Sequence, residues 1–255
     1  MNEALEFYDK YLDDAYFYDN GLSLIDIPSK PANNIENSML QDMYKLQVTP
    51  EDIQVEIEFI LGQLMMKNNT TMIFSRAGQG KSMFVLALCL QLLKNKVMEE
   101  VIYLDMDNPL VSLKMRNIDS IINREPKLHY FNPAANKNCT PSNMMEMLLQ
   151  MAKGDPKVFK NKLIVFDSIR NFALGKDSSK DRDIGPLMQK IQEIREANAT
   201  VIFLHHASRE SDGKAFKGSS SFEDAIDSSL VLSSKKIDGK LVVTVSNDKN
   251  RNAPG

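Results

Sequence analysis

The chain has 255 residues, of which 43% are hydrophobic, 25% charged and 7% aromatic, and it has no tryptophan. This composition is typical of a soluble globular protein and excludes collagen-like, low-complexity and largely disordered chains. No run of about 18 apolar residues occurs, so the sequence predicts no membrane-spanning helix. The acidic start lacks a basic and then apolar leader, and Cys89 and Cys139 form no disulfide or metal-ligand pattern. These features together favour a cytoplasmic protein.

The formal net charge of −3 hides an uneven distribution along the chain. Residues 1–60 hold 13 acidic and 3 basic residues, a net charge of −10, whereas residues 61–255 hold 21 acidic and 28 basic residues, a net charge of +7. Such a division is typical of a protein whose basic part meets anionic ligands.

Residues 1–48 do not have the pattern of a packed domain, so we expect an acidic N-terminal arm followed by a larger domain over residues 49–255. Within the arm, Leu5, Tyr8, Leu12 and Tyr16 have the spacing of one helical face, and a linker with turn character follows. The segment 50–66 resembles a helix, with Thr49 as its cap and acidic residues at its start.

From residue 70 onward, short apolar runs alternate with amphipathic stretches. Strands that are apolar on both faces and alternate with helices indicate an α/β fold with a mainly parallel sheet flanked by helices. Asp238-Gly239 lies between the last two runs and predicts a C-terminal antiparallel hairpin. The expected strands are 71–75, 101–105, 128–132, 162–167, 200–206, 229–234 and 240–246, and the expected helices lie near 81–96, 109–123, 142–153 and 186–197.

A phosphate-binding loop is predicted directly after the first strand. Lysine in this motif reaches the β- and γ-phosphates, and the following hydroxyl ligates Mg²⁺, so Lys81 and Ser82 have these roles. The match is partial, because the strict motif has glycine where Ser75 stands. The loop consists of Ser75, Arg76, Ala77, Gly78, Gln79, Gly80, Lys81 and Ser82.

Acidic residues follow two further strands at the same edge of the expected sheet. Asp167 ends a buried strand and is placed to orient a water bound to Mg²⁺. Asp105 and Asp107 follow the second strand, and either could orient the water that attacks the γ-phosphate; Asp107 is the favoured base. The alternative is that these carboxylates only cap the helix that begins near Pro109.

Together with the C-terminal segment Lys249–Gly255, these motifs resemble the RecA-type ATPase core, and most closely the DnaB-like and RepA-like hexameric replicative helicases. The resemblance covers roughly residues 60–255. It implies a RecA-like fold, ATP and Mg²⁺ as ligands, a hexameric homo-oligomer and single-stranded DNA as a partner. It also implies that the acidic arm docks on an adjacent subunit, as a linker helix does in these helicases.

The resemblance assigns roles to single residues. Ser75-Arg76 matches the start of DnaB-like phosphate loops, and Asp107 stands where these helicases have a catalytic glutamate. His206 occupies the position of a polar γ-phosphate sensor, although the neighbouring His205 is an alternative. Lys249 and Arg251 match a Lys-x-Arg pair that contacts the neighbouring subunit's γ-phosphate.

The same resemblance places a DNA-binding loop at residues 209–221, where Lys214, Lys217 and the backbone of Gly218 would hold the DNA. A second candidate loop spans residues 174–183 and contains Lys176, Lys180 and Arg182. The favoured function is a ring-forming ATP-dependent helicase or translocase. The alternatives are a RecA-like recombinase or regulatory ATPase without unwinding activity, and a nucleotide-binding loader or partner module that does not hydrolyse ATP.

Overall fold

The computed structural model describes residues 34–54, 56–173, 181–207, 220–238 and 240–250. The chain divides into two compact units, residues 1–55 and 56–255. The first unit contains helix α2 (Asn34–Tyr44), where the sequence predicted only a linker. Its Met39, Met43 and Tyr44 side chains are exposed. The helical stripe predicted from Leu5 to Tyr16 lies outside the described residues.

The prediction of a helix over residues 50–66 is wrong. The Thr49 cap does form, because Thr49 and Asp52 exchange hydrogen bonds between their backbone amides and side chains, but only a single turn follows. Residues 56–66 instead double back at Gly62, whose φ is +53°, and Ile60 donates a backbone hydrogen bond to Met65 at 2.9 Å. Burial of Ile60 and Met65 in the core stabilises this irregular chain more than helical hydrogen bonds would.

One mainly parallel sheet of seven strands forms the centre of the second unit, in the order β3-β2-β4-β5-β1-β6-β7. Strands β1 to β6 run parallel to one another. Strand β7 pairs antiparallel with β6, which confirms the predicted C-terminal hairpin. The strands are β1 (Thr70–Ser75), β2 (Glu100–Asp105), β3 (Leu128–Phe131), β4 (Lys162–Asp167), β5 (Thr200–His206), β6 (Ser228–Ile237) and β7 (Lys240–Asn250).

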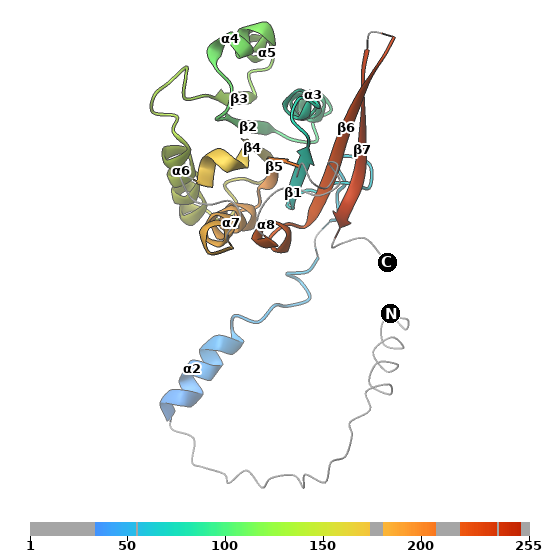
Figure 1. The fold of residues 1–255 in the computed structure, drawn as a ribbon. Helices are drawn as coiled ribbons and strands as arrows, with labels where there is room; N and C mark the ends of the chain where they lie inside the picture. Colours follow the sequence, from blue (N-terminus) through green and yellow to red (C-terminus); the bar gives the residue numbers. More distant parts are fainter. Residues whose placement is uncertain (1–33, 55, 174–180, 208–219, 239, 251–255) are drawn as a thin grey trace, which may run out of the picture. The chain divides into compact units, whose positions relative to one another are not determined.

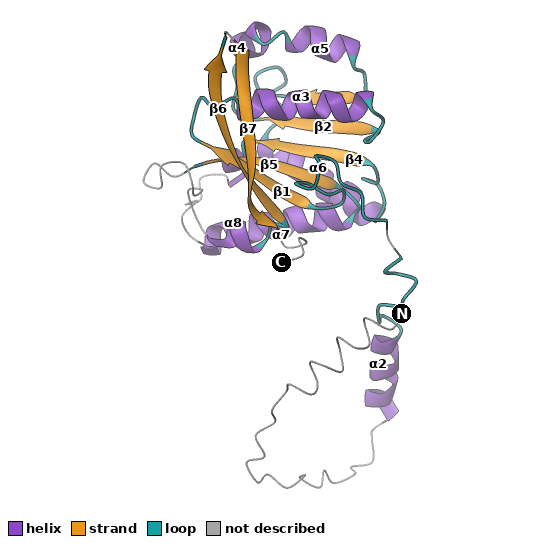
Figure 2. Ribbon diagram, turned by 90° about the vertical axis from the view of Figure 1, so that its right-hand side faces the viewer, coloured by secondary structure: helices purple, strands orange, loops and turns teal. Residues whose placement is uncertain are grey.

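Helices cover both faces of this sheet (Figures 1 and 2). On one face, α3 (Lys81–Lys94), α4 (Leu110–Met115) and α5 (Ile118–Arg124) pack on a core that includes Ile73, Val101 and Leu204. On the other face lie α6 (Pro141–Gly154), the 3₁₀ helix η1 (Ile169–Ala173), α7 (Asp181–Glu196) and α8 (Ser220–Asp224). Because neighbouring strand residues face opposite sides, each central strand contributes to both cores, which explains its continuous apolar sequence.

Two helix predictions had incorrect boundaries. The pattern over 109–123 forms two helices, because Asn117 adopts a left-handed conformation with φ +53° between them. Helix α7 begins at Asp181 rather than near Pro186, which lies inside the helix. Among the described helices, none has both the length and the apolar character needed to cross a bilayer.

Candidate active site

The loop between β1 and α3 has the backbone conformation of a phosphate-binding loop. Gly78 and Gly80 have φ values of +79° and +81°, which residues with a side chain rarely adopt. Within the described part of the chain, no side chain caps α3, whose N-cap is Gly80, so the amides of its first turn are left to bind an external acceptor. Apart from the adjoining residues, a Cβ atom at Gly78 would meet no atom of the described residues within 4 Å, so the loop surface there is open.

Lys81 is the first residue of α3, and its side chain reaches back to the start of this loop. Its Nζ donates hydrogen bonds to Oγ of Ser75 at 3.1 Å and to the Ser75 carbonyl at 3.2 Å. Burial lowers the pKa of the ammonium group, and the carboxylates of Asp167 and Asp107 oppose this shift. The ammonium group is therefore partly desolvated and lies in the field of two acids, as a phosphate-binding lysine requires.

Gln79 joins the phosphate loop to the C-terminal hairpin. Its Oε1 accepts hydrogen bonds from the backbone amide and the hydroxyl of Ser234, at 2.7 and 3.0 Å. Ser234 lies three residues beyond Val231, the last β6 residue paired with β1. The side chain of Gln79 thus continues the contact between these elements where the strand pairing ends.

Asp167 lies at the end of β4, buried beside the phosphate loop. Tyr103 donates a 2.8 Å hydrogen bond to its Oδ2, and Ser82 donates another. Burial raises the pKa of Asp167 to about 6, against the effect of these two hydrogen bonds, and the charges of Asp105 and Asp107 raise it further. A nearby cation would stabilise the ionised form of this buried carboxylate.

Asp105 and Asp107 have different environments, although both follow β2. Asp105 is fully buried, and its Oδ1 accepts hydrogen bonds from the amides of Asp107 and Asn108 at 3.2 and 3.1 Å. Its Oδ2 accepts a 2.6 Å hydrogen bond from Tyr130. Asp107 is exposed, and Asn171 Nδ2 donates to its Oδ1 at 3.3 Å. Asp105 therefore shapes the turn, whereas Asp107 remains available to a water molecule.

Two tyrosines hold these carboxylates, and sequence reasoning missed both. Tyr103 and Tyr130 are register partners on β2 and β3, and their rings stack with centroids 4.9 Å apart. Burial raises the pKa of each hydroxyl, so both remain protonated donors to Asp167 and Asp105. No sequence motif marks them, because the pairing depends on the register of two strands.

His205 and His206 end β5 and face different surroundings. His205 is buried, and its ring packs on Phe222 of α8 with centroids 4.6 Å apart. His206 is partly exposed and lines the cavity beside the phosphate loop. This alternation along the strand favours His206 over His205 as the residue that faces a bound nucleotide.

A cavity of about 360 Å³ brings these residues together. It includes most of the predicted site and one basic residue, Arg116 at the end of α4, that the sequence analysis did not single out. Arg116 has no motif around it, and only the path of α4 places it here. The lining residues are Ala77, Gly78, Gly80, Lys81, Ser82, Met83, Asp107, Asn108, Arg116, Asp167, Ser168, Leu204 and His206.

Lys249 lies apart from this cavity. It pairs with Ser229 in the β6–β7 ladder, and Ser229 pairs with Met72 near the start of β1. Its Nζ donates a 2.5 Å hydrogen bond to the carbonyl of Glu223 in α8. The other predicted residues of the finger and of the DNA-binding loop, Arg251, Lys214, Lys217 and Gly218, lie outside the described residues, as do Lys176 and Lys180.

The residues around the cavity fit Mg²⁺ bound together with a nucleotide. Ser82 and the buried Asp167 share a hydrogen bond at its wall and supply the hydroxyl and carboxylate oxygens that this hard cation prefers. In the described part of the chain, no group of three or more His, Cys, Asp or Glu residues could hold a metal on its own. Phosphate oxygens and waters would complete the coordination, as is usual for Mg²⁺ in phosphoryl-transfer sites.

Comparisons with known proteins agree with this fold. A KaiC-like protein from the hyperthermophilic archaeon Pyrococcus horikoshii matches with a TM-score of 0.53 and 16% identity, over 74% of this chain and 82% of that chain. No curated protein matches the sequence. The sheet order and this neighbour show a RecA-like fold, in which the phosphate loop follows β1. The family described as AAA domain matches residues 54–212, and the chain belongs to this family.

Proposed function

We propose that the protein is a ring-forming, ATP-dependent translocase of the DnaB-like and RepA-like type that moves along single-stranded DNA. The observation that carries the ATPase part is the cavity in which Lys81, Asp107 and Asp167 lie together beside the phosphate loop. The DNA part rests on the sequence resemblance and on the charge of +7 in residues 61–255.

The charged and polar side chains named below have distinct roles in the proposed hydrolysis. The loop amides and Lys81 bind the β- and γ-phosphates, and Ser82 and Asp167 hold Mg²⁺, which neutralises phosphate charge when bound. The exposed carboxylate of Asp107 orients a water toward the γ-phosphorus and accepts its proton. Asn171 donates a hydrogen bond to one oxygen of Asp107 and so helps to orient the carboxylate that binds this water. Arg116 and His206 contact the γ-phosphate from the cavity wall.

A second subunit supplies Arg251 in this proposal. Lys249, two residues earlier, lies beside the early part of β1, three residues or about 10 Å before the phosphate loop begins. The end of β7 thus leads away from the cavity of its own subunit. In this proposal Arg251 contacts the γ-phosphate bound to a neighbouring copy and stabilises transition-state charge there.

The first test is ATP turnover with and without single-stranded DNA, together with the particle mass under both conditions. We expect turnover that single-stranded DNA stimulates and a hexamer in the presence of ATP. Lys81→Ala should abolish turnover, with a loss of at least about 10²–10³-fold, because it removes the main phosphate-binding cation. Turnover without any DNA response would instead support a regulatory ATPase, and nucleotide binding without turnover would support the loader.

The second test separates the trans contact from the rest of the site. Arg251→Ala should remove turnover but leave nucleotide affinity unchanged, and the matched control Lys236→Ala, an exposed cation on the same hairpin, should change neither. Persistence of turnover in Arg251→Ala would contradict the contact. A strand-separation assay with a forked substrate then distinguishes unwinding from translocation alone.

A further inference from the structure

Helix α8 is a five-residue helix between two strands that are not neighbours in the sheet. A helix of this length is not stable alone, so contacts from elsewhere must hold it in place. One contact is apolar: Phe222 is fully buried against the rings of His205 and Phe203, with centroid distances of 4.6 and 6.1 Å. This contact joins α8 to the end of β5.

The second contact is polar and comes from β7. Lys249 Nζ donates to the carbonyl of Glu223, in the last turn of α8. Carbonyls in the last turn of a helix have no partner within the helix, and a cation there also meets the negative end of the helix dipole. Hydrogen bonds from a charged donor are roughly twice as strong as neutral ones. Lys249 is therefore committed to α8 of its own subunit.

We propose that Lys249 is a positioning residue that acts within its own subunit, where it fixes α8 against the strand that carries His206. This inference rests on the proposed function, and it separates Lys249 from Arg251, which alone acts on the neighbour. The contacts run from Lys249 to Glu223, from Phe222 to His205, and along the strand to His206 in the cavity. Loss of the amine releases α8 and lets the end of β5 shift.

The kinetic test uses Lys249→Met, which keeps the length of the side chain but removes the donor. We expect kcat to fall about tenfold, since a small displacement of a γ-phosphate contact is costly. KM for ATP should change by less than about twofold, because the phosphate loop is untouched. Lys249→Arg retains a charged donor and should recover most of the activity, and Lys236→Met is the matched control on the same hairpin. An unchanged kcat in Lys249→Met would overturn the proposal.

Mixed assemblies distinguish action within a subunit from action on a neighbour. Lys81→Ala subunits have an inactive site but an intact C-terminal segment, so they should restore turnover to Arg251→Ala subunits. They should not restore turnover to Lys249→Met subunits, whose defect lies beside their own site. Restoration of Lys249→Met would show that Lys249 acts across the interface and would overturn the proposal.

Hydrogen exchange tests the contact independently of activity. In the full-length protein, Lys249→Met should increase amide exchange over residues 220–226, whereas Lys236→Met should not, and equal exchange would overturn the proposal. A wild-type protein that forms no ring or has no turnover would contradict the proposed function instead. The exchange measurement would still decide whether Lys249 holds α8.

Discussion

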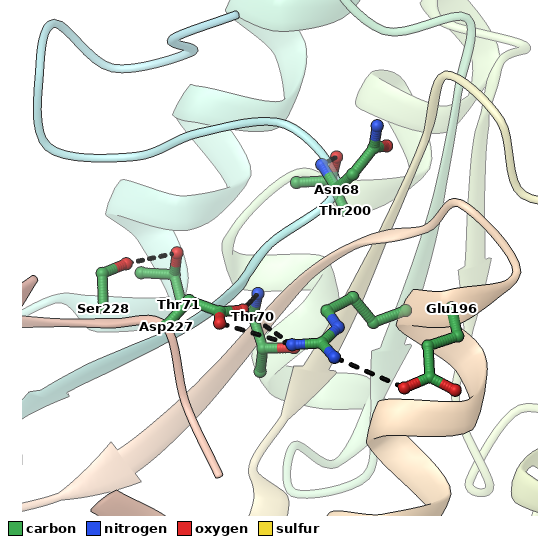
Figure 3. A network of polar contacts seen from close by, with 8 residues as sticks. Asn68, Thr70, Thr71, Glu196, Thr200, Asp227 and Ser228 are labelled. Atoms are coloured by element: carbon green, nitrogen blue, oxygen red, sulfur yellow. Dashed lines mark hydrogen bonds and ion pairs between the residues drawn. The ribbon is translucent and has the colours of Figure 1, made fainter. Parts of the chain in front are cut away.

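At the amino ends of β1, β5 and β6, polar side chains pair with one another, whereas at the carboxyl ends of β1, β2, β4 and β5 they face a cavity. Figure 3 shows the first group, in which Asp227 accepts a hydrogen bond from the Thr70 amide at 2.8 Å. Asp227 also pairs with the guanidinium of Arg195 at 3.2 Å. Thr71 and Ser228 share a further hydrogen bond at 2.9 Å.

The polar groups at the two ends of the sheet have opposite effects on the stability of the folded protein. At the amino end, the acid of Asp227 is matched by a base and an amide, so its burial stabilises the fold. At the carboxyl end, the pKa of Asp167 is raised by burial and by two nearby acids, so its ionised form costs stability. Substitutions at the amino end should therefore change stability alone, and those at the carboxyl end should change activity first.

The largest expected effect comes from Asp107, which we propose as the base. Asp107→Ala should lower ATP turnover by about 10²–10⁴-fold, because the attacking water loses its proton acceptor. The free energy of unfolding should change by less than about 0.5 kcal/mol, since the side chain is exposed. Steady-state phosphate release and urea denaturation measure the two quantities.

Asp105→Ala is the matched control for that substitution. It removes the acceptor of four hydrogen-bond donors, namely the Asp107 amide, the backbone and side-chain amides of Asn108 and the Tyr130 hydroxyl, and should destabilise the protein by about 3 kcal/mol. If Asp107→Ala instead lost stability and Asp105→Ala retained it, the assignment of the two carboxylates would be reversed.

The next largest effect is expected from a substitution at the amino ends of the strands. Asp227→Ala leaves the Thr70 amide without its acceptor and leaves Arg195 paired with the more exposed Glu196, so we expect a loss of about 2–3 kcal/mol of stability. Turnover per folded molecule should remain unchanged. Asp227→Asn retains an acceptor for the amide and should lose less, so equal losses in both variants would contradict this explanation.

A smaller effect with the opposite sign is expected at Asp167. Its pKa is raised from 3.8 to about 6 by burial, so the folded protein binds a proton more tightly than the unfolded chain does. Through this group, stability is greatest below pH 3.8 and falls as the pH rises toward 6. At about pH 7.5, without nucleotide or Mg²⁺, Asp167→Asn should therefore be more stable than the wild type by about 2 kcal/mol.

That advantage should disappear near pH 4, where the wild-type carboxyl group is protonated. Asp167→Asn should also lose Mg²⁺-dependent turnover, because the amide no longer supplies a carboxylate. Urea denaturation at both pH values measures the stability. A variant that is less stable than the wild type at pH 7.5 would show that the ionised carboxylate is well accommodated.

The sequence predicted the carboxyl end of the sheet better than the amino end for a physical reason. The phosphate loop is a local motif, since the two positive φ values at Gly78 and Gly80 and the helix start are set within a few residues. The alternation of apolar runs likewise predicted the sheet and the C-terminal hairpin. Asp227, by contrast, meets Arg195 and Thr70 only after the chain has folded, at separations of 32 and 157 residues.

The same limit applies inside the site. Tyr103 and Tyr130 became recognisable only from the β2–β3 register, and Arg116 only from the path of α4. The error over residues 50–66 has a related cause: apolar residues with helical spacing are buried there by a chain that reverses at Gly62. Local spacing does not distinguish the two structures, because burial of Ile60 and Met65 in the core decides between them.

The smallest expected effect is at Thr70, where the amino end is incompletely paired. Its side-chain oxygen is fully buried and has no hydrogen-bond partner among the described residues, although its backbone amide and carbonyl both bond to Asp227. Thr70→Val removes this hydroxyl without changing the shape of the side chain and should stabilise the protein by about 1 kcal/mol, with turnover unchanged. Thr71→Val is the matched control, because its hydroxyl is bonded to Ser228, and it should destabilise the protein by about 1 kcal/mol. Equal losses in the two variants, measured by urea denaturation, would show that a buried water pairs with Thr70 and that polar groups at the amino end are fully satisfied.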